Sequence, residues 1–202
     1  RQSRQRIVAA AADLIYEHGV GGTTLDAVCA ASGASRSQLY HYFDDKSDLV
    51  RAVIAHRVEV LLGSQADVLA SLDTIDGLRR WRNLMVDLQR QSDCRGGCPI
   101  GSLAAELADH DEAARLDLHQ AFQRWQAHIS NGLRAMRDRG ELDDTDVDEL
   151  ALATMASLEG GLILARTAQS TRPLEVALDA AIAHITHHLM VNNSATPPPN
   201  IH

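Results

Sequence analysis

Polar and aromatic side chains crowd one short stretch of the chain, residues 35–43 (SRSQLYHYF). Arg36 and Gln38 can donate or accept hydrogen bonds, and the tyrosines beside them can stack. Only Leu39 and Phe43, four residues apart, offer an apolar seam to a helix in this stretch. A short helix with a thin apolar seam and a polar, aromatic outer face is suited to docking in the DNA major groove.

The residues around this stretch predict the helices that must position it. Apolar residues at helical spacing favour a first helix over residues 3–18, which Gly19 would end. Thr24 is placed to cap a second helix, and Ser35 with Gln38 forms the S-x-x-Q capping box of a third. Caps and apolar stripes predict further helices that begin near Asp44 or Asp45, after Thr74 and at Pro99, and others over about 111–139, 144–169 and 172–190.

The composition favours an all-helical protein. Of the 202 residues, 45% are hydrophobic and only 3% are aromatic, and no β-alternation or internal repeat is recognisable. We predict an all-α fold of about nine helices, an N-terminal three-helix helix-turn-helix domain followed by a helical bundle. The expected domains are 1–46 for DNA binding and 47–191 for ligand binding and dimerisation, with a disordered proline-rich tail at 192–202.

The charge and the cysteines limit the class of protein. A net charge of −8 argues against indiscriminate nucleic-acid binding. Residues 1–50 carry five basic and six acidic side chains, so most of the negative charge lies elsewhere and this end would turn toward phosphates. No run is long and apolar enough for a bilayer, no signal peptide is recognisable, and three cysteines do not suggest a disulfide scaffold. We therefore expect a cytoplasmic protein without membrane contact.

The segment GTTLDAVCAASGASRSQLYHYFDDKSDL resembles the DNA-binding signature of the tetracycline repressor (TetR) family. The elements that carry the resemblance are Thr24, Gly33-Ala34-Ser35, Leu39 to Phe43 and Lys46 to Leu49, in the family's order. The strong match covers residues 6–50, and the order of the later helices is similar to that of the family's ligand-binding and dimerisation domain. The resemblance implies a DNA-binding transcriptional regulator and not an enzyme, with repression as the usual mode.

The resemblance also implies which residues touch DNA. Base or groove contacts are expected from Arg36, Ser37, Gln38 and His41, and phosphate contacts from Thr24, Tyr40, Tyr42 and Lys46, with Ser35 in the same set. Arg36 can hold guanine through two hydrogen bonds, and Gln38 can pair with adenine unless the capping box occupies it. Asp26 stands where the family often has a basic or neutral residue, and it would repel phosphate if it faced DNA. The other interpretation is an ordinary solvated helix face.

Two cysteines are candidates for redox chemistry. Cys98 precedes Pro99 at a predicted helix N-terminus, where the helix dipole favours a thiolate, and Arg95 is near in sequence. Cys94, four residues earlier, is placed to act as a resolving partner. The segment GGCPIGSLAAELAD also looks like the sixth-helix region of a TetR subgroup, and some members of similar groups sense electrophiles or oxidants there. The opposite interpretation makes Cys98 a small buried residue at the corner between loop and helix.

Motifs for catalysis or metal binding are not recognisable. The sequence contains no Walker loop, HExxH, GxSxG or paired-carboxylate motif. His184 and His188 share a helix face, but no carboxylate or cysteine accompanies them in that segment, which favours a packing or interface role. We therefore predict no catalytic residue, no metal site and no cofactor.

A helix-turn-helix protein of this size needs two heads to cover enough DNA, so we predict a homodimer on a palindromic double-stranded operator. The last two long helices should pair with their symmetry mates in a four-helix bundle. Interface candidates on these helices are Leu158, Gly161, Ala165, Ala181, Ile185 and His188. The adjacent Gly160 and Gly161 are expected to permit close helix contact.

A small, mainly apolar effector is expected to bind inside the bundle of residues 75–165 and to change the spacing of the heads, with the fourth helix as lever. Candidate lining residues, each of which also fits an ordinary core, are Trp81, Met85, Leu88, Leu103, Leu107, Phe122, Trp125, Met155 and Leu158. Two alternatives stay open. One is a regulator that senses electrophiles or oxidants through Cys98, and the other is a ligand-binding protein that does not bind DNA.

Overall fold

The computed structural model describes residues 2–190, and within this range the chain forms ten α-helices and no strand. The helices are α1 (Gln2–Gly22), α2 (Leu25–Ser32), α3 (Arg36–Tyr42), α4 (Lys46–Ser64), α5 (Ala66–Leu69), α6 (Ile75–Gln91), α7 (Pro99–Leu107), α8 (Glu112–Asp138), α9 (Val147–Ala168) and α10 (Arg172–His187). The predicted all-α class is confirmed, and the helix that the sequence did not indicate is α5, a single turn too short for a periodic pattern. The predicted tail at 192–202 lies outside the described residues.

Side-chain caps begin several helices at the predicted positions. Thr24, Asp45 and Thr74 each accept a hydrogen bond from the backbone N–H three residues ahead, at 2.8–3.1 Å. Ser35 and Gln38 complete the predicted capping box, with the two N–H···O distances at 3.1 and 3.0 Å. Because these bonds satisfy N–H groups that a helix start leaves free, the starts of α2, α3, α4 and α6 are fixed by local sequence.

Helix α1 breaks its regular geometry at Gly19, where φ is 73° and ψ is 170°. A side chain there would be strained, so glycine permits the chain to turn at this point. The predicted end of the first helix is thereby confirmed, and the following turn leads the chain to the cap of α2.

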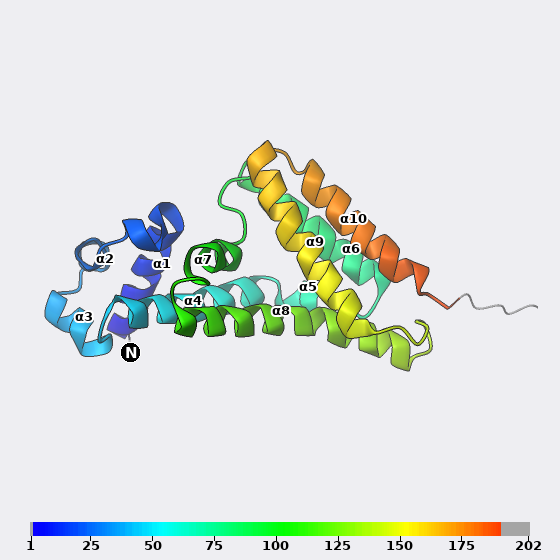
Figure 1. The fold of residues 1–202 in the computed structure, drawn as a ribbon, viewed down its shortest axis with the longest axis horizontal. Helices are drawn as coiled ribbons and strands as arrows, with labels where there is room; N and C mark the ends of the chain where they lie inside the picture. Colours follow the sequence, from blue (N-terminus) through cyan, green and yellow to red (C-terminus); the bar gives the residue numbers. More distant parts are fainter. Residues whose placement is uncertain (1, 191–202) are drawn as a thin grey trace, which may run out of the picture.

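The helices form a small unit at one end and a larger bundle at the other (Figure 1). Helices α1 to α3 make the small unit, while α9, α10 and α6 pack together at the opposite end. The long α4 packs against α1 and against α7 and α8, so it connects the two parts. Two fully buried tryptophans, Trp81 and Trp125, lie in the core of the bundle. None of the described helices has both the length and the apolarity needed to cross a membrane.

Candidate nucleic-acid interface and ligand cavity

Helix α3 presents most of the predicted DNA-binding side chains to solvent at one end of the molecule (Figure 1). Leu39 and Phe43 are 0% and 1% exposed and anchor this short helix to the core beneath it. The exposed members of the predicted set are Thr24, Ser35, Arg36, Ser37, Gln38, Tyr40 and His41. These residues are therefore accessible to solvent at this end of the molecule, while the two apolar residues of α3 are buried.

Tyr42 and Lys46 are only partly exposed. The Tyr42 ring packs against the core and edge-on against His41, with 4.9 Å between ring centroids. Lys46 Nζ donates a hydrogen bond to the Val20 carbonyl oxygen at 2.6 Å. Lys46 thus ties the start of α4 to the end of α1, a structural contact that the sequence did not indicate.

Asp26 on α2 pairs with Arg36 on α3. The Asp26 carboxylate accepts hydrogen bonds from Arg36 Nε and Nη2, each at 2.6 Å. This hydrogen bonding lowers the pKa of Asp26 and raises the pKa of Arg36. Both side chains are about two-thirds exposed, at 64% and 67%. The pair therefore stands in solvent on the same end of the molecule as the α3 surface.

The pairing leaves one edge of the Arg36 guanidinium free. Of its five N–H groups, the carboxylate takes one on Nε and one on Nη2. The outward edge between Nη1 and Nη2 keeps a parallel pair of donors, which is the fork that matches guanine O6 and N7. Arg36 can therefore hold Asp26 side-on and a base end-on at the same time.

Glu106 on α7 joins the bundle to the end of α1. Its two carboxylate oxygens accept hydrogen bonds from the backbone N–H groups of Val20 and Gly21, at 2.9 and 2.7 Å. These N–H groups follow the break in helical geometry at Gly19, so α1 itself leaves them without a partner. The sequence gives no sign of this contact, because the residues that it joins are more than 80 positions apart.

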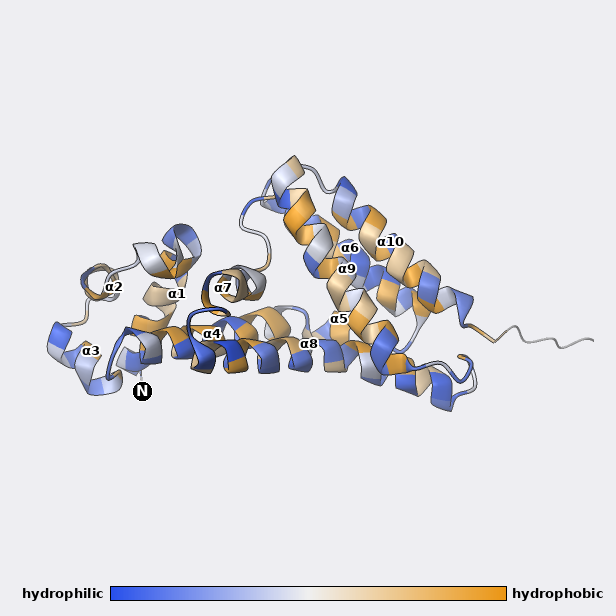
Figure 2. Ribbon diagram, in the orientation of Figure 1, coloured by the Kyte–Doolittle hydropathy of each residue, from blue (hydrophilic) through white to orange (hydrophobic). Residues whose placement is uncertain are grey.

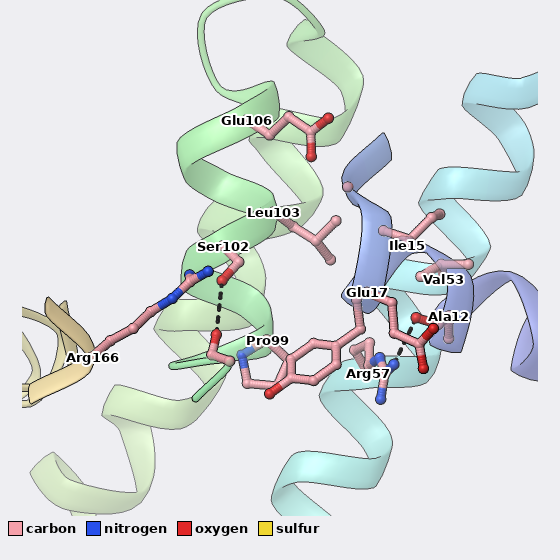
Figure 3. Close-up of a pocket in the computed structure, with 13 residues that line it drawn as sticks. Ala12, Ile15, Glu17, Val53, Arg57, Pro99, Ser102, Leu103, Glu106 and Arg166 are labelled. Carbon is pink, nitrogen blue, oxygen red and sulfur yellow. Dashed lines mark hydrogen bonds between the residues drawn. The ribbon is translucent and has the colours of Figure 1, made fainter. Parts of the chain in front are cut away.

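A cleft of about 170 Å³ lies between α1, α4 and α7 beside this contact. Figure 3 shows Leu103 and Glu106 of α7 on one side of the cleft, Ile15 of α1 on the other, and Arg57 extending from α4. Arg57 Nη2 donates to the Ala12 carbonyl oxygen at 2.6 Å, which ties α4 to α1. The polar contacts across this joint therefore reach α1 from both α4 and α7.

A larger cavity of about 270 Å³ opens within the bundle, bordered by α4, α6, α8, α9 and the loop before α7. Three of the predicted lining residues, Met85, Leu88 and Trp125, border it. Leu103 borders the cleft beside α1 instead. The remaining candidates do not line this cavity and pack in or against the hydrophobic core: Trp81, Leu107, Phe122, Met155 and Leu158.

These five residues lie outside the walls of this cavity. An apolar stripe at helical spacing marks a buried face but does not tell a cavity wall from a close-packed core. Trp81 illustrates the difference, since its Nε1–H is already satisfied by Gln65 Oε1 at 3.2 Å. The sequence also did not indicate Gln65 and Gln89, two buried polar residues that line the cavity.

Two buried polar atoms from residues that line the cavity have no hydrogen-bond partner among residues 2–190: Gln89 Oε1 and Trp125 Nε1. Gln89 is 8% exposed and Trp125 is 1% exposed. Buried polar groups are nearly always paired in folded proteins, so each of these atoms can still form a hydrogen bond with water or with a ligand. Their environment is otherwise mainly apolar, with Leu61, Met85 and Leu162 in the same wall.

Cys98 lies between this cavity and a smaller hollow of about 140 Å³ that Glu159 and Arg166 border. Its Sγ caps α7 by accepting from the Gly101 N–H at 3.3 Å, but the residue is only 6% exposed. Burial, together with the nearby Glu159, raises the pKa of Cys98 well above its usual range. The expectation of a dipole-stabilised thiolate was therefore wrong, because desolvation outweighs the helix N-terminus.

The predicted resolving partner is also inaccessible. Cys94 is 4% exposed, and both thiols are free. The same burial raises the pKa of Glu159. The surroundings of Cys98 are thus those of a corner residue packed between loop and helix, which is the opposite interpretation given above for this residue.

Helices α9 and α10 pack on each other through the residues predicted for a dimer interface. Leu158, Ala165 and Ile185 are 0% exposed in the single chain, and Ala181 is 8% exposed. At Gly161, an added Cβ would lie 3.0 Å from the Leu174 Cα atom. The prediction that these residues meet a second copy was wrong, because periodicity identifies an apolar stripe but not the helix that covers it.

His188, the last interface candidate, is half-buried and pairs within the chain. Its Nδ1 lies 3.0 and 3.1 Å from the two carboxylate oxygens of Asp143. In the described range, no group of three or more histidines, cysteines or acids is arranged to hold a metal ion.

A different apolar surface is exposed on the same two helices. Apolar residues recur along the outer sides of α9 and α10 (Figure 2). Its large members are Leu152, Ile163, Leu164 and Val176, which are 48–65% exposed. Single exposed apolar residues are common, but several on two adjacent helices mark an interaction surface.

Two family models match most of the chain. The family described as "Bacterial regulatory proteins, tetR family" matches residues 7–53. The family described as "Transcriptional regulator LmrA/YxaF-like, C-terminal domain" matches residues 74–180, more than half of the chain. The first match covers the α3 surface, and the second covers α9 and the part of the 270 Å³ cavity that α6, α8, α9 and the loop before α7 border.

Characterised sequences and solved structures agree with these matches. The HTH-type transcriptional regulator LmrA of Bacillus subtilis is 29% identical over 177 residues, which cover 85% of this chain and 90% of that protein. The transcriptional regulator AcuR of Cereibacter sphaeroides is 26% identical, with coverage of 85% and 80%. A TetR transcriptional regulator from Chloroflexus aurantiacus is similar in structure, with a TM-score of 0.77, 30% identity and coverage of 93% and 96%.

Proposed function

Since the chain belongs to the tetracycline repressor (TetR) family, with an LmrA/YxaF-like C-terminal domain, we propose that it is a homodimeric repressor released from a palindromic operator by a small, mainly apolar effector. The chain is a transcriptional regulator with a DNA-binding helix-turn-helix, and neither its family nor its fold is that of an enzyme. The observation that carries the proposal is the exposed α3 surface, where Asp26 holds the Arg36 guanidinium and leaves its outer edge free.

On this proposal, Arg36 reads a guanine with its free edge, and Ser37 and His41 reach neighbouring base edges. Gln38 reads no base, because its side-chain oxygen is occupied by the Ser35 N–H in the capping box. Thr24 and Tyr40 contact phosphates, while the Ser35 hydroxyl oxygen is occupied by the Gln38 N–H in the capping box. We place the border between the DNA-binding domain (1–46) and the ligand-binding and dimerisation domain (47–191) at the start of α4.

The exposed apolar surface of α9 and α10 supports the homodimer. Paired with their symmetry mates, these helices would form a four-helix bundle that covers Leu152, Ile163, Leu164 and Val176. Leu164→Glu should therefore give a monomer in light scattering, while the matched Leu116→Glu, at an exposed leucine on α8, should leave the dimer intact. A monomeric wild-type protein at micromolar concentration would contradict the proposed dimer.

Helix α7 supplies a physical link between effector and operator. The loop and first residue of α7 border the cavity, while Glu106, two turns later, holds the backbone of α1. A ligand that displaces Pro99 would shift Glu106 and thereby tilt the DNA-binding unit relative to α4. Glu106→Gln weakens this hold, so effector should still bind the variant but release operator less completely.

DNA binding is tested by selecting an operator from a random duplex pool and measuring fluorescence anisotropy against it with a salt titration. Arg36→Ala should weaken operator binding by about 5- to 150-fold, the range of one two-bond base contact. The control Arg80→Ala, an exposed arginine on α6, should have little effect. If no sequence is enriched, the alternative of a ligand-binding protein without DNA binding replaces the proposal.

A further inference from the structure

We infer that the 270 Å³ cavity takes an uncharged, mainly apolar molecule that presents a hydrogen-bond acceptor to Trp125 Nε1 and a donor to Gln89 Oε1, the chemistry of a carboxamide or lactam on an aromatic ring system. This inference names the ligand class of the effector site and rests on the function proposed above.

The acceptor requirement comes from Trp125. An indole N–H can only donate, and this one is buried without a partner in the described chain. The other tryptophan shows the ordinary arrangement, because Trp81 Nε1–H donates to Gln65 Oε1 at 3.2 Å. A carbonyl oxygen on the ligand would accept a hydrogen bond from Trp125 Nε1–H, as Gln65 Oε1 does from Trp81 Nε1–H.

The donor requirement comes from Gln89 on α6. Its side-chain oxygen is buried without a partner, and an amide oxygen can only accept. A carboxamide or lactam carries both a carbonyl oxygen and an N–H, so a ligand of this class can supply the acceptor as well as the donor. The rest of such a ligand would lie against Leu61, Met85 and Leu162.

The charges around the cavity favour an uncharged ligand. The lining contains two arginines, Arg57 and Arg95, and no carboxylate, so a cation would be repelled and would find no counter-charge. Arg57 already donates to the Ala12 carbonyl at 2.6 Å and lies over the Tyr16 ring at 5.3 Å. Asp13, 3.4 Å from Arg57 Nη2, offsets part of that charge, and Arg95 is exposed to solvent, so an anion would leave water for weakly attractive arginines.

The test compares three probes on one scaffold: naphthalene-2-carboxamide, 2-methylnaphthalene and the cation 2-naphthylmethylammonium. In isothermal titration calorimetry, we expect the carboxamide to bind wild-type protein at least about fivefold more tightly than 2-methylnaphthalene, the worth of its polar contacts. The ammonium probe should bind more weakly than both. Equal affinity for the carboxamide and 2-methylnaphthalene, or tighter binding of the cation, would overturn the inference.

The hydrogen bond itself is read from the indole N–H signals of ¹⁵N-labelled protein. The chain has two tryptophans, so the signal that is lost in Trp125→Phe belongs to Trp125 and the remaining one to Trp81. The carboxamide should move the Trp125 signal downfield and leave that of Trp81 unchanged, while 2-methylnaphthalene should cause no downfield movement. A Trp125 signal that does not respond to the bound carboxamide would refute the assignment.

Two variants complete the design. Trp125→Phe and Gln89→Leu should each remove the preference for carboxamide over 2-methylnaphthalene. The matched Gln91→Leu, at an exposed glutamine on α6 outside the cavity, should keep it. A preference that survives both cavity variants would refute the inference. Operator release is measured separately by anisotropy: binding with the expected Trp125 shift but without release would uphold the ligand chemistry and refute the proposed effector response.

Discussion

Replacing Asp26 by asparagine separates two effects on DNA binding that have opposite signs. The carboxylate accepts two hydrogen bonds from Arg36 at 2.6 Å, one on each oxygen, but an asparagine side chain has one uncharged oxygen and cannot form this parallel pair. Arg36 then samples more rotamers, and we expect operator affinity to fall by about three- to tenfold. Removal of one negative charge from the DNA-facing end should strengthen binding to random duplex by about twofold at low salt.

The measurement is fluorescence anisotropy of Asp26→Asn against the selected operator and against a random duplex of equal length. The preference for operator over random DNA should fall by about tenfold. The control Asp44→Asn makes the same charge change at an exposed acid just beyond α3 and should strengthen both complexes alike. Because the Asp26–Arg36 pair is about two-thirds exposed, the Tm of either variant should stay close to that of the wild type.

If Asp26→Asn increases the affinity for operator by the same factor as the affinity for random DNA, then Asp26 only repels phosphate. The role of Arg36 as a pre-positioned base reader would then be refuted, while the family assignment and the dimer would be unaffected.

Three further predictions concern the bundle. Gly161→Ala should lower the free energy of unfolding by about 1 kcal/mol, because overpacking beside Leu174 exceeds the gain in helix propensity. Gly160→Ala, whose Cβ meets no atom within 4 Å, should not lower it. Equal changes in Tm for the two variants would show that Gly161 does not pack closely against Leu174. Cys98 should be alkylated at least about tenfold more slowly in native than in unfolded protein, because burial raises its pKa and blocks access of the reagent. Peptide mass spectrometry follows the reaction. Similar rates in the two states would support a sensor role for Cys98. Burial also raises the pKa of Glu159, so the folded state favours the protonated form. Stability should fall as pH rises above the ordinary carboxyl pKa and through the raised one. The Tm advantage of Glu159→Gln should therefore grow as pH rises, and a difference that does not change with pH would contradict this.

The sequence was sufficient wherever a feature depends on residues a few positions apart. The caps at Thr24, Asp45 and Thr74 were predicted because each joins a side chain to a backbone N–H three residues ahead. The exposed face of α3 followed from a helical period in which only Leu39 and Phe43 are apolar. The order of these local features was also enough for the family resemblance, and hence for DNA binding.

One expectation about a pair of glycines shows where local reasoning stopped. Both Gly160 and Gly161 were expected to permit close helix contact, but only Gly161 lies against α10. The two residues are adjacent in sequence and point to different sides of α9, so the neighbouring helix determines which one needs to be small.

Tertiary structure alone determined the partners of each side chain. Periodicity placed Leu158 on an apolar face, but only the packing of α9 on α10 showed that this face is covered within the chain and that Ile163 is the exposed one. The expectation of a thiolate at Cys98 was wrong, because the desolvation that raises its pKa depends on neighbours from distant segments, such as Glu159. The contacts of Asp26 with Arg36 and of Glu106 with α1 join separate helices, and no short sequence pattern encodes them, because the distance between two helices is set by how the whole chain packs.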